Sequence, residues 1–153
     1  MPRYCPAVTA SRARFVAVAL FVTPVVGACG AGGDDGRATG AKGRYVAQVD
    51  PVCVELQAKV GELGQEAGKQ AEDVNAAIER IKAVPKPAED SEIADLYRAA
   101  LENVALSLQA VDQGRMAKDQ GRVDRGLADA KINNQRAAEA AQKYGMVECA
   151  RPL

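Results

Sequence analysis

Apolar and small residues recur in steps of three and four along most of the chain after residue 44, which is the spacing of one face of an α-helix. The first stripe begins at Tyr45 and continues through Val46, Val49, Cys53, Leu56, Val60, Leu63 and Ala67. The same phase resumes at Val74, Ala77, Ile78, Ile81 and Val84. Asp50-Pro51 interrupts this stripe early, so we expect the helix to begin there or to bend after a short leading turn.

Three glycines, Gly61, Gly64 and Gly68, divide the stripe. Each glycine costs about 1 kcal/mol relative to alanine inside a helix, so three within eight residues favour a break. We therefore predict two helices, at about 45–62 and 70–84. The alternative is one long first helix over about 45–84.

Pro85-Lys86-Pro87 ends this part, and Asp90 or Ser91 is placed to cap a third helix. Its stripe is the clearest in the chain, and Gly114 stands as its expected C-cap. A fourth helix is predicted from about Met116 to Tyr144, with Gly145 as its stop. The stripe of the third helix comprises Ile93, Leu96, Tyr97, Ala100, Leu101, Val104, Leu108 and Val111, and that of the fourth comprises Val123, Leu127, Ala130, Asn134, Ala137, Ala141 and Tyr144. The predicted fold is all-α, an up-and-down bundle of four helices, or of three if the first helix is continuous.

The segment before these helices has the plan of a secretory signal. Arg3, Arg12 and Arg14 precede the apolar run Phe15 to Val26, and Gly27 and Ala28 stand before Cys29. Pro24 and Gly27 interrupt the run before the roughly 20 apolar residues of a membrane span. The small residues before Cys29 resemble the lipobox of bacterial lipoproteins, which implies cleavage after Ala28 and lipidation of Cys29. The alternative is ordinary signal-peptidase cleavage after Ala28 and release of a secreted protein.

The predicted domains follow from this reading: a cleaved signal at 1–28, the lipidated cysteine with a flexible Gly-rich linker at 29–43, and a helical domain at 44–153. The whole chain carries 20 basic and 20 acidic residues. Removing the signal takes away three basic residues and no acid, which leaves a formal net charge of −3. The mature protein therefore has no overall attraction for nucleic acid or for an anionic membrane surface. Its anchor would be the lipid, at the outer face of the cell membrane.

Cys53 and Cys149 are the two cysteines that remain beside Cys29 after cleavage. In an extracytoplasmic domain an even pair predicts a structural disulfide. A redox-active pair is the alternative, but the spacing is far from a Cys-x-x-Cys motif.

The sequences Tyr45-Val-Ala-Gln-Val-Asp-Pro-Val-Cys53 and Tyr144-Gly-Met-Val-Glu-Cys149 resemble the two ends of a family of small actinobacterial secreted proteins and lipoproteins. The resemblance extends over most of residues 45–150, including the Pro85-Lys86-Pro87 joint. It implies an alanine-rich helical bundle in which Cys53 is joined to Cys149, and it implies no established activity.

We expect no enzymatic activity, no catalytic residues, no cofactor and no metal site. The chain contains no histidine, which is the commonest general base and a frequent metal ligand. It also has no Gly-rich phosphate loop, serine-centred elbow or zinc-type cysteine cluster.

Two functional hypotheses follow. The first is an envelope interaction or scaffold protein that contacts a partner through Arg115, Lys118, Arg122 and Arg125, which are spaced along one helical edge. The alternative for these four residues is an ordinary solvated face, because Asp119 and Asp124 are interleaved with them.

The second hypothesis is a carrier of a small apolar ligand, whose pocket would be lined by Tyr45, Tyr97, Met116 and Tyr144. Asn134 would point into that pocket or set the helix register. Leu106 and Ile132 lie outside the stripes, as a contact surface or as ordinary exposed residues. The sequence does not predict the oligomeric state.

Overall fold

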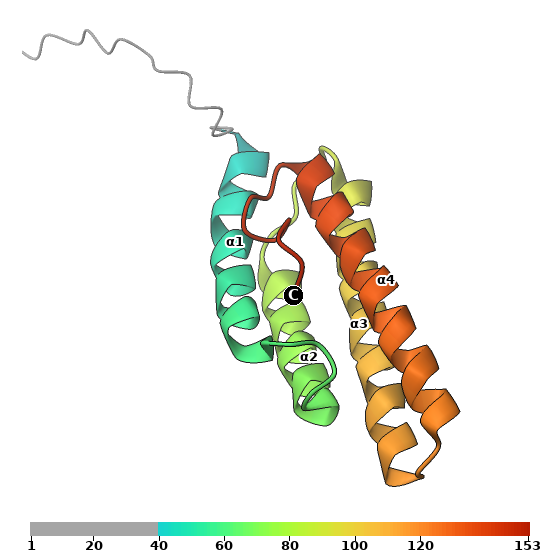
Figure 1. Ribbon diagram of the computed structural model, residues 1–153. Coiled ribbons are helices and arrows are strands. Elements are labelled where there is room, and N and C mark those ends of the chain that lie inside the picture. The colour runs from blue at the N-terminus through green and yellow to red at the C-terminus, as the bar shows by residue number, and fades with distance from the viewer. Residues whose placement is uncertain (1–39) are drawn as a thin grey trace, which may run out of the picture. The chain divides into compact units, whose positions relative to one another are not determined.

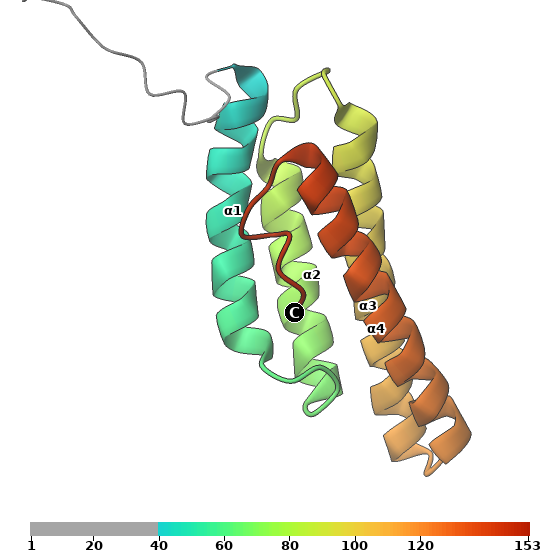
Figure 2. The ribbon, with the colours of Figure 1, turned by 45° about the horizontal axis from the view of Figure 1, so that its top comes forward.

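The predicted stripes form four successive helices, each antiparallel to the next (Figures 1 and 2). The computed structural model describes residues 40–153, so the predicted signal, the cleavage site at Ala28 and Cys29 lie outside the described residues. The helices are α1 (Ala41–Val60), α2 (Ala67–Ala83), α3 (Ser91–Met116) and α4 (Gln120–Tyr144). This confirms the all-α fold of four helices and excludes the continuous first helix. None of these helices is long and apolar enough to cross a membrane.

The helices pack in chain order, α1 on α2, α2 on α3 and α3 on α4, and α1 does not reach α4 within the described residues. The segment after α4, residues 145–153, turns back and runs between α1 and α4 (Figures 1 and 2). We call residues 145–153 the C-terminal strap. It begins at Gly145, whose positive φ of 91° suits glycine and ends the helix as predicted. Met146 then packs into the core with 1% of its surface exposed.

Gln70 builds the turn between α1 and α2. Its side-chain nitrogen donates to the carbonyl oxygens of Val60 and Glu62 at 2.6 and 2.7 Å, and its oxygen accepts from the Gly64 backbone nitrogen at 2.7 Å. The residue is 3% exposed, so these bonds are shielded from water. Gly61 and Gly64 both take positive φ in this turn, which is the physical reason for the break that the three glycines predicted.

Four predicted helix boundaries are wrong. α2 begins at Ala67, not at about residue 70. α1 begins at Ala41, so Pro51 lies well inside the helix. α3 does not end at Gly114 but continues to Met116, and α4 consequently begins at Gln120. Gly114 allows α3 and α4 to pack closely, because a Cβ there would lie 3.0 Å from the Val123 backbone nitrogen. Asp90 occupies the N-cap position of α3 without a side-chain capping bond.

One predicted core position is also wrong. Leu96 is 63% exposed, although the sequence places it on the inner stripe of α3. Leu106 and Ile132, which fall outside the stripes, are 60% and 50% exposed. The buried residues include many alanines and valines beside the larger aliphatic and tyrosine side chains. α3 and α4 approach closely at Gly126, where a Cβ would meet the Ser107 carbonyl oxygen at 3.0 Å. Close helix approach thus compensates for a core poor in aromatic residues.

We predict that Gln70→Leu destabilises the domain by about 3 kcal/mol, because it removes three buried hydrogen bonds and leaves backbone groups of the turn unsatisfied. Urea unfolding of the mature chain, followed by circular dichroism, measures the change. Gln65→Leu is the matched control: its side chain is exposed and makes one surface hydrogen bond, so we expect a change within about 0.5 kcal/mol. Equal effects of the two substitutions would contradict this role of Gln70.

Candidate functional site

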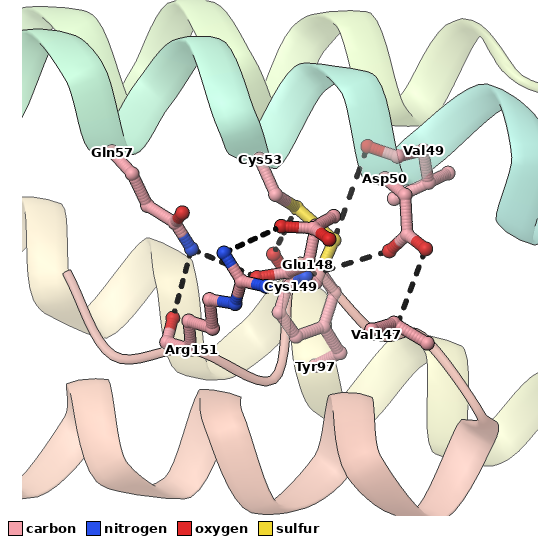
Figure 3. The surroundings of a disulfide bond; sticks show 9 residues. All are labelled: Val49, Asp50, Cys53, Gln57, Tyr97, Val147, Glu148, Cys149 and Arg151. Carbon is pink, nitrogen blue, oxygen red and sulfur yellow. Dashed lines mark hydrogen bonds and ion pairs between the residues drawn. A yellow bond between two sulfur atoms is a disulfide. The ribbon is translucent and has the colours of Figure 1, made fainter.

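The disulfide joins Cys53 of α1 to Cys149 of the C-terminal strap, with an S–S distance of 1.98 Å and Cα atoms 5.1 Å apart (Figure 3). This confirms the predicted pairing, and it links residues 96 positions apart. The Tyr97 hydroxyl of α3 lies 3.0 Å from the Cys53 sulfur. Because that sulfur carries no proton in the disulfide, the hydroxyl is the donor.

Side chains on α1 hold the strap on both sides of the disulfide (Figure 3). Asp50 accepts hydrogen bonds from the backbone nitrogens of Val147 and Cys149, at 3.2 and 3.4 Å. Gln57 donates to the carbonyl oxygens of Glu148 and Arg151, at 2.8 and 3.1 Å. Asp50, Cys53 and Gln57 are spaced by three and four residues, so they share one face of α1. The strap contains no helix, and these bonds satisfy some of its backbone N–H and C=O groups.

Asn134 of α4 holds the far end of the strap. Its side-chain nitrogen donates to the Leu153 carbonyl oxygen at 3.0 Å, and its side-chain oxygen accepts from the Leu153 backbone nitrogen at 3.1 Å. The polar residue on the stripe of α4 therefore pairs with the strap. This fixes the place of the strap between α1 and α4.

Met116 does not join the other predicted pocket residues. Tyr45, Tyr97 and Tyr144 are 4%, 2% and 0% exposed, whereas Met116 is 72% exposed at the opposite end of the bundle. The Tyr45 and Tyr144 rings pack edge to face with their centroids 5.5 Å apart. A cavity of about 10 Å³ lies beside the disulfide, lined in part by Tyr97 and Asn134, and this is the space of about one water molecule.

The four predicted partner-contact residues gather at the turn between α3 and α4, although not along one helix. Arg115 belongs to the last turn of α3, Lys118 to the connection, and Arg122 and Arg125 to the start of α4. We call these four residues the basic tip. All four are exposed, and none of the ion pairs in the described residues involves them.

The acids beside the basic tip form hydrogen bonds but no ion pair with its cations. Asp119 caps α4 by accepting from the Arg122 backbone nitrogen at 3.0 Å, and Asp124 accepts from the Gln120 side chain at 2.8 Å. Two of the cations are oriented by neutral groups: Arg115 donates to the Gln65 carbonyl oxygen at 2.8 Å, and Arg122 donates to the Gln113 side chain at 2.5 Å. The basic tip is therefore an ordered cationic surface.

Among residues 40–153, no group of three His, Cys, Asp or Glu side chains is placed to hold a metal ion. The sequence analysis overlooked Gln57 and Gln70, and it gave Asp50 no structural role. The helical spacing of Asp50 and Gln57 around Cys53 was a usable signal. No such spacing marks Gln70, because its three hydrogen-bond partners are backbone groups.

We predict that Asp50→Asn destabilises the domain by about 1–2 kcal/mol with the disulfide intact. The amide keeps one acceptor but turns a donor toward the other backbone nitrogen. Thermal unfolding measures the effect. Asp129→Asn, at an exposed acid of α4, is the control and should leave the midpoint unchanged. If Asp50→Asn is equally silent, the strap does not depend on this carboxylate.

We also predict that the domain unfolds in alkali as its tyrosines ionise. Burial raises the pKa of Tyr45, Tyr97 and Tyr144 above the ordinary value of 10.0. Above about pH 10 the unfolded chain releases protons that the folded chain retains, so stability is complete below that pH and falls as the pH rises. For Tyr97 the slope is about 1.4 kcal/mol per pH unit.

The measurement follows tyrosinate absorbance and helical circular dichroism together in an alkaline titration. The two signals should change in one transition, and Tyr97→Phe should make the loss of stability with pH shallower. Tyrosinate absorbance that rises while the helices persist would show that the three phenols are open to solvent.

Comparison of the chain with protein-family models, with curated proteins and with solved structures found no match. A functional conclusion must therefore come from the residues and their geometry. The geometry gives the two terminal motifs, around Cys53 and Cys149, a structural role, because they meet in the attachment of the strap. Arg115 links α3 to the turn between α1 and α2 through the Gln65 carbonyl oxygen. Within residues 40–153, the other three cations of the basic tip have no such contact with a distant segment, so the basic tip is the leading candidate for a functional surface.

Proposed function

We propose that this chain is a lipid-anchored extracytoplasmic scaffold protein of the cell envelope, which presents the basic tip to an acidic partner protein. The observation that carries the proposal is the basic tip itself: four exposed cations, with no ion pair among the described residues, on a domain whose mature net charge is negative. A local charge of this sign favours encounter with an acidic surface.

The position of the basic tip supports this proposal. The turn between α3 and α4 lies at the opposite end of the bundle from the start of α1 (Figures 1 and 2). The proposed lipid at Cys29 precedes α1 by twelve residues, so an anchor would attach at the other end. Met116 adds an exposed apolar side chain beside the cations, as is common in protein interfaces.

The disulfide is consistent with the proposed compartment, because disulfides persist in oxidising surroundings outside the cytoplasm. The cysteine after Gly27-Ala28 supports the lipid anchor. The alternative of a carrier has less support, since Tyr45 packs on Tyr144 and the Tyr97 hydroxyl donates to the disulfide. A ligand would have to displace this packing.

The test is crosslinking in the native envelope, followed by identification of the partners. We expect that replacing all four residues of the basic tip with Gln lowers recovery of an acidic partner by about tenfold, because the charges that steer association are gone. The matched control replaces four exposed cations elsewhere, Lys59, Lys131, Arg136 and Lys143, and should preserve recovery.

Equal recovery with both variants would contradict a role of the basic tip. The anchor is tested in the same cells: mass spectrometry of the membrane fraction should find an acylated peptide that begins at Cys29. A Cys29→Ser chain should appear in the medium. An unmodified chain released by wild-type cells would refute the anchor while leaving the result on the basic tip intact.

A further inference from the structure

A second cationic site lies at the other end of the bundle from the basic tip. A groove of about 300 Å³ separates the start of α1 from the connection between α2 and α3. Arg44, Tyr45 and Gln48 line it from α1, and Pro85, Lys86 and Pro87 line it from the connection. We call it the proline groove. Its charged lining residues are both cations, and its apolar lining is supplied by the prolines and Tyr45.

We propose that the proline groove binds the phosphate of an anionic phospholipid headgroup, with Arg44 and Lys86 as the phosphate ligands. This inference rests on the proposed lipid anchor. Arginine offers a planar set of donors that matches phosphate oxygens, and lysine offers a compact positive charge. The two prolines restrict the backbone on both sides of Lys86, which reduces the backbone entropy lost when a ligand orders this segment.

Lys86 can turn to a phosphate without leaving an acid unpaired. Its present partner is Asp95 of α3, whose pKa is held below its ordinary value chiefly by the hydrogen bond from Lys86. Asp95 also accepts from Arg98 at 2.7 Å, so it keeps one cationic partner when Lys86 leaves. For Arg44, the described residues contain no ion pair.

Asp90, an acid of the connection, also has a cationic partner. Asp90 pairs with Lys42 at 2.6 Å, and the same lysine nitrogen lies 4.9 Å from the centre of the Tyr144 ring. Lys42 is therefore committed to Asp90, while Arg44 and Lys86 are available to a ligand. Glu89 and Glu92, the acids on either side of Asp90 in the sequence, do not line the groove.

The occupant follows from the length of chain that precedes the groove. Ala41 lines the groove, and only residues 30–40 separate it from Cys29. A flexible chain of this length has a mean end-to-end distance of roughly 20 Å, so an anchored domain meets headgroups at a high effective concentration. Even a weak phosphate site then becomes occupied. An acidic protein segment is the alternative occupant, and it lacks this advantage.

The test uses the mature chain from Cys29, whose single free thiol is coupled to a maleimide lipid in vesicles. This chemical tether replaces the cellular anchor, so the result does not depend on acylation in the cell. The vesicles contain either phosphatidylcholine alone or an equimolar mixture with phosphatidylglycerol. We expect slower amide exchange at residues 41–48 and 84–90 in the anionic vesicles only.

Matched variants identify the ligands. Arg44→Gln with Lys86→Gln should lower the affinity for phosphatidylglycerol by about thirtyfold and abolish the slowing. Arg44→Lys with Lys86→Arg should retain it, and Lys118→Gln with Arg122→Gln at the basic tip should have no effect. Both lining cations are exposed, so thermal unfolding should confirm that each variant folds.

Three outcomes would overturn the proposal: equal exchange in the two kinds of vesicle, slowing that survives the loss of Arg44 and Lys86, and slowing that disappears with the basic-tip variant. Protection by a free acidic peptide that anionic vesicles do not reproduce would assign the groove to a protein instead. The absence of acyl groups on Cys29 in cells would refute the anchor, and a positive vesicle result would still establish the site.

Discussion

The bundle depends on the attachment of the C-terminal strap to α1. Among the helices, α1 packs on α2 alone, so the remaining side of α1 is covered by the strap instead of by α4. The Cys53–Cys149 disulfide, the Asp50 carboxylate and the Gln57 amide all act on this one contact. A bridge that closes a loop of this length is worth at most about 4–5 kcal/mol, a large share of the stability of a small domain. The first helix of the bundle is thus stabilised by the last residues of the chain.

The helical stripes and the cysteine pair were predictable because each follows a local rule. The three- and four-residue spacing gave the four helices, and Gly61, Gly64 and Gly145 marked turns where the backbone needs positive φ. The predicted end of α3 at Gly114 was wrong for a physical reason. A glycine near a helix end is normally a stop, but here the close approach of α4 requires a residue without a side chain. Only the tertiary packing distinguishes the two uses.

The strap was beyond local rules, since residues 145–153 have no periodicity and gain their place from side chains nearly 100 residues away. Cys149 alone indicated that this segment returns to α1. The spacing of the four cations of the basic tip suggested one helical edge. The turn between α3 and α4 instead brings them together from two helices. The proline groove joins two segments about forty residues apart, and no sequence pattern relates them.

The two cationic surfaces differ in a way that bears on function. Arg44 and Lys86 border a groove that Pro85, Pro87 and Tyr45 also line, whereas the four residues of the basic tip lie exposed at the turn between α3 and α4. Between them lies the length of α3, whose 26 residues span roughly 40 Å. A domain held at the membrane by the proline groove would carry the basic tip at about that height above the headgroups. Without the groove, the anchor proposed at Cys29 would not fix the orientation of the domain, and the basic tip would be attracted to the same anionic surface. With a phosphate bound at the groove as we propose, the rigid bundle would hold the basic tip away from the membrane and leave it free for a partner.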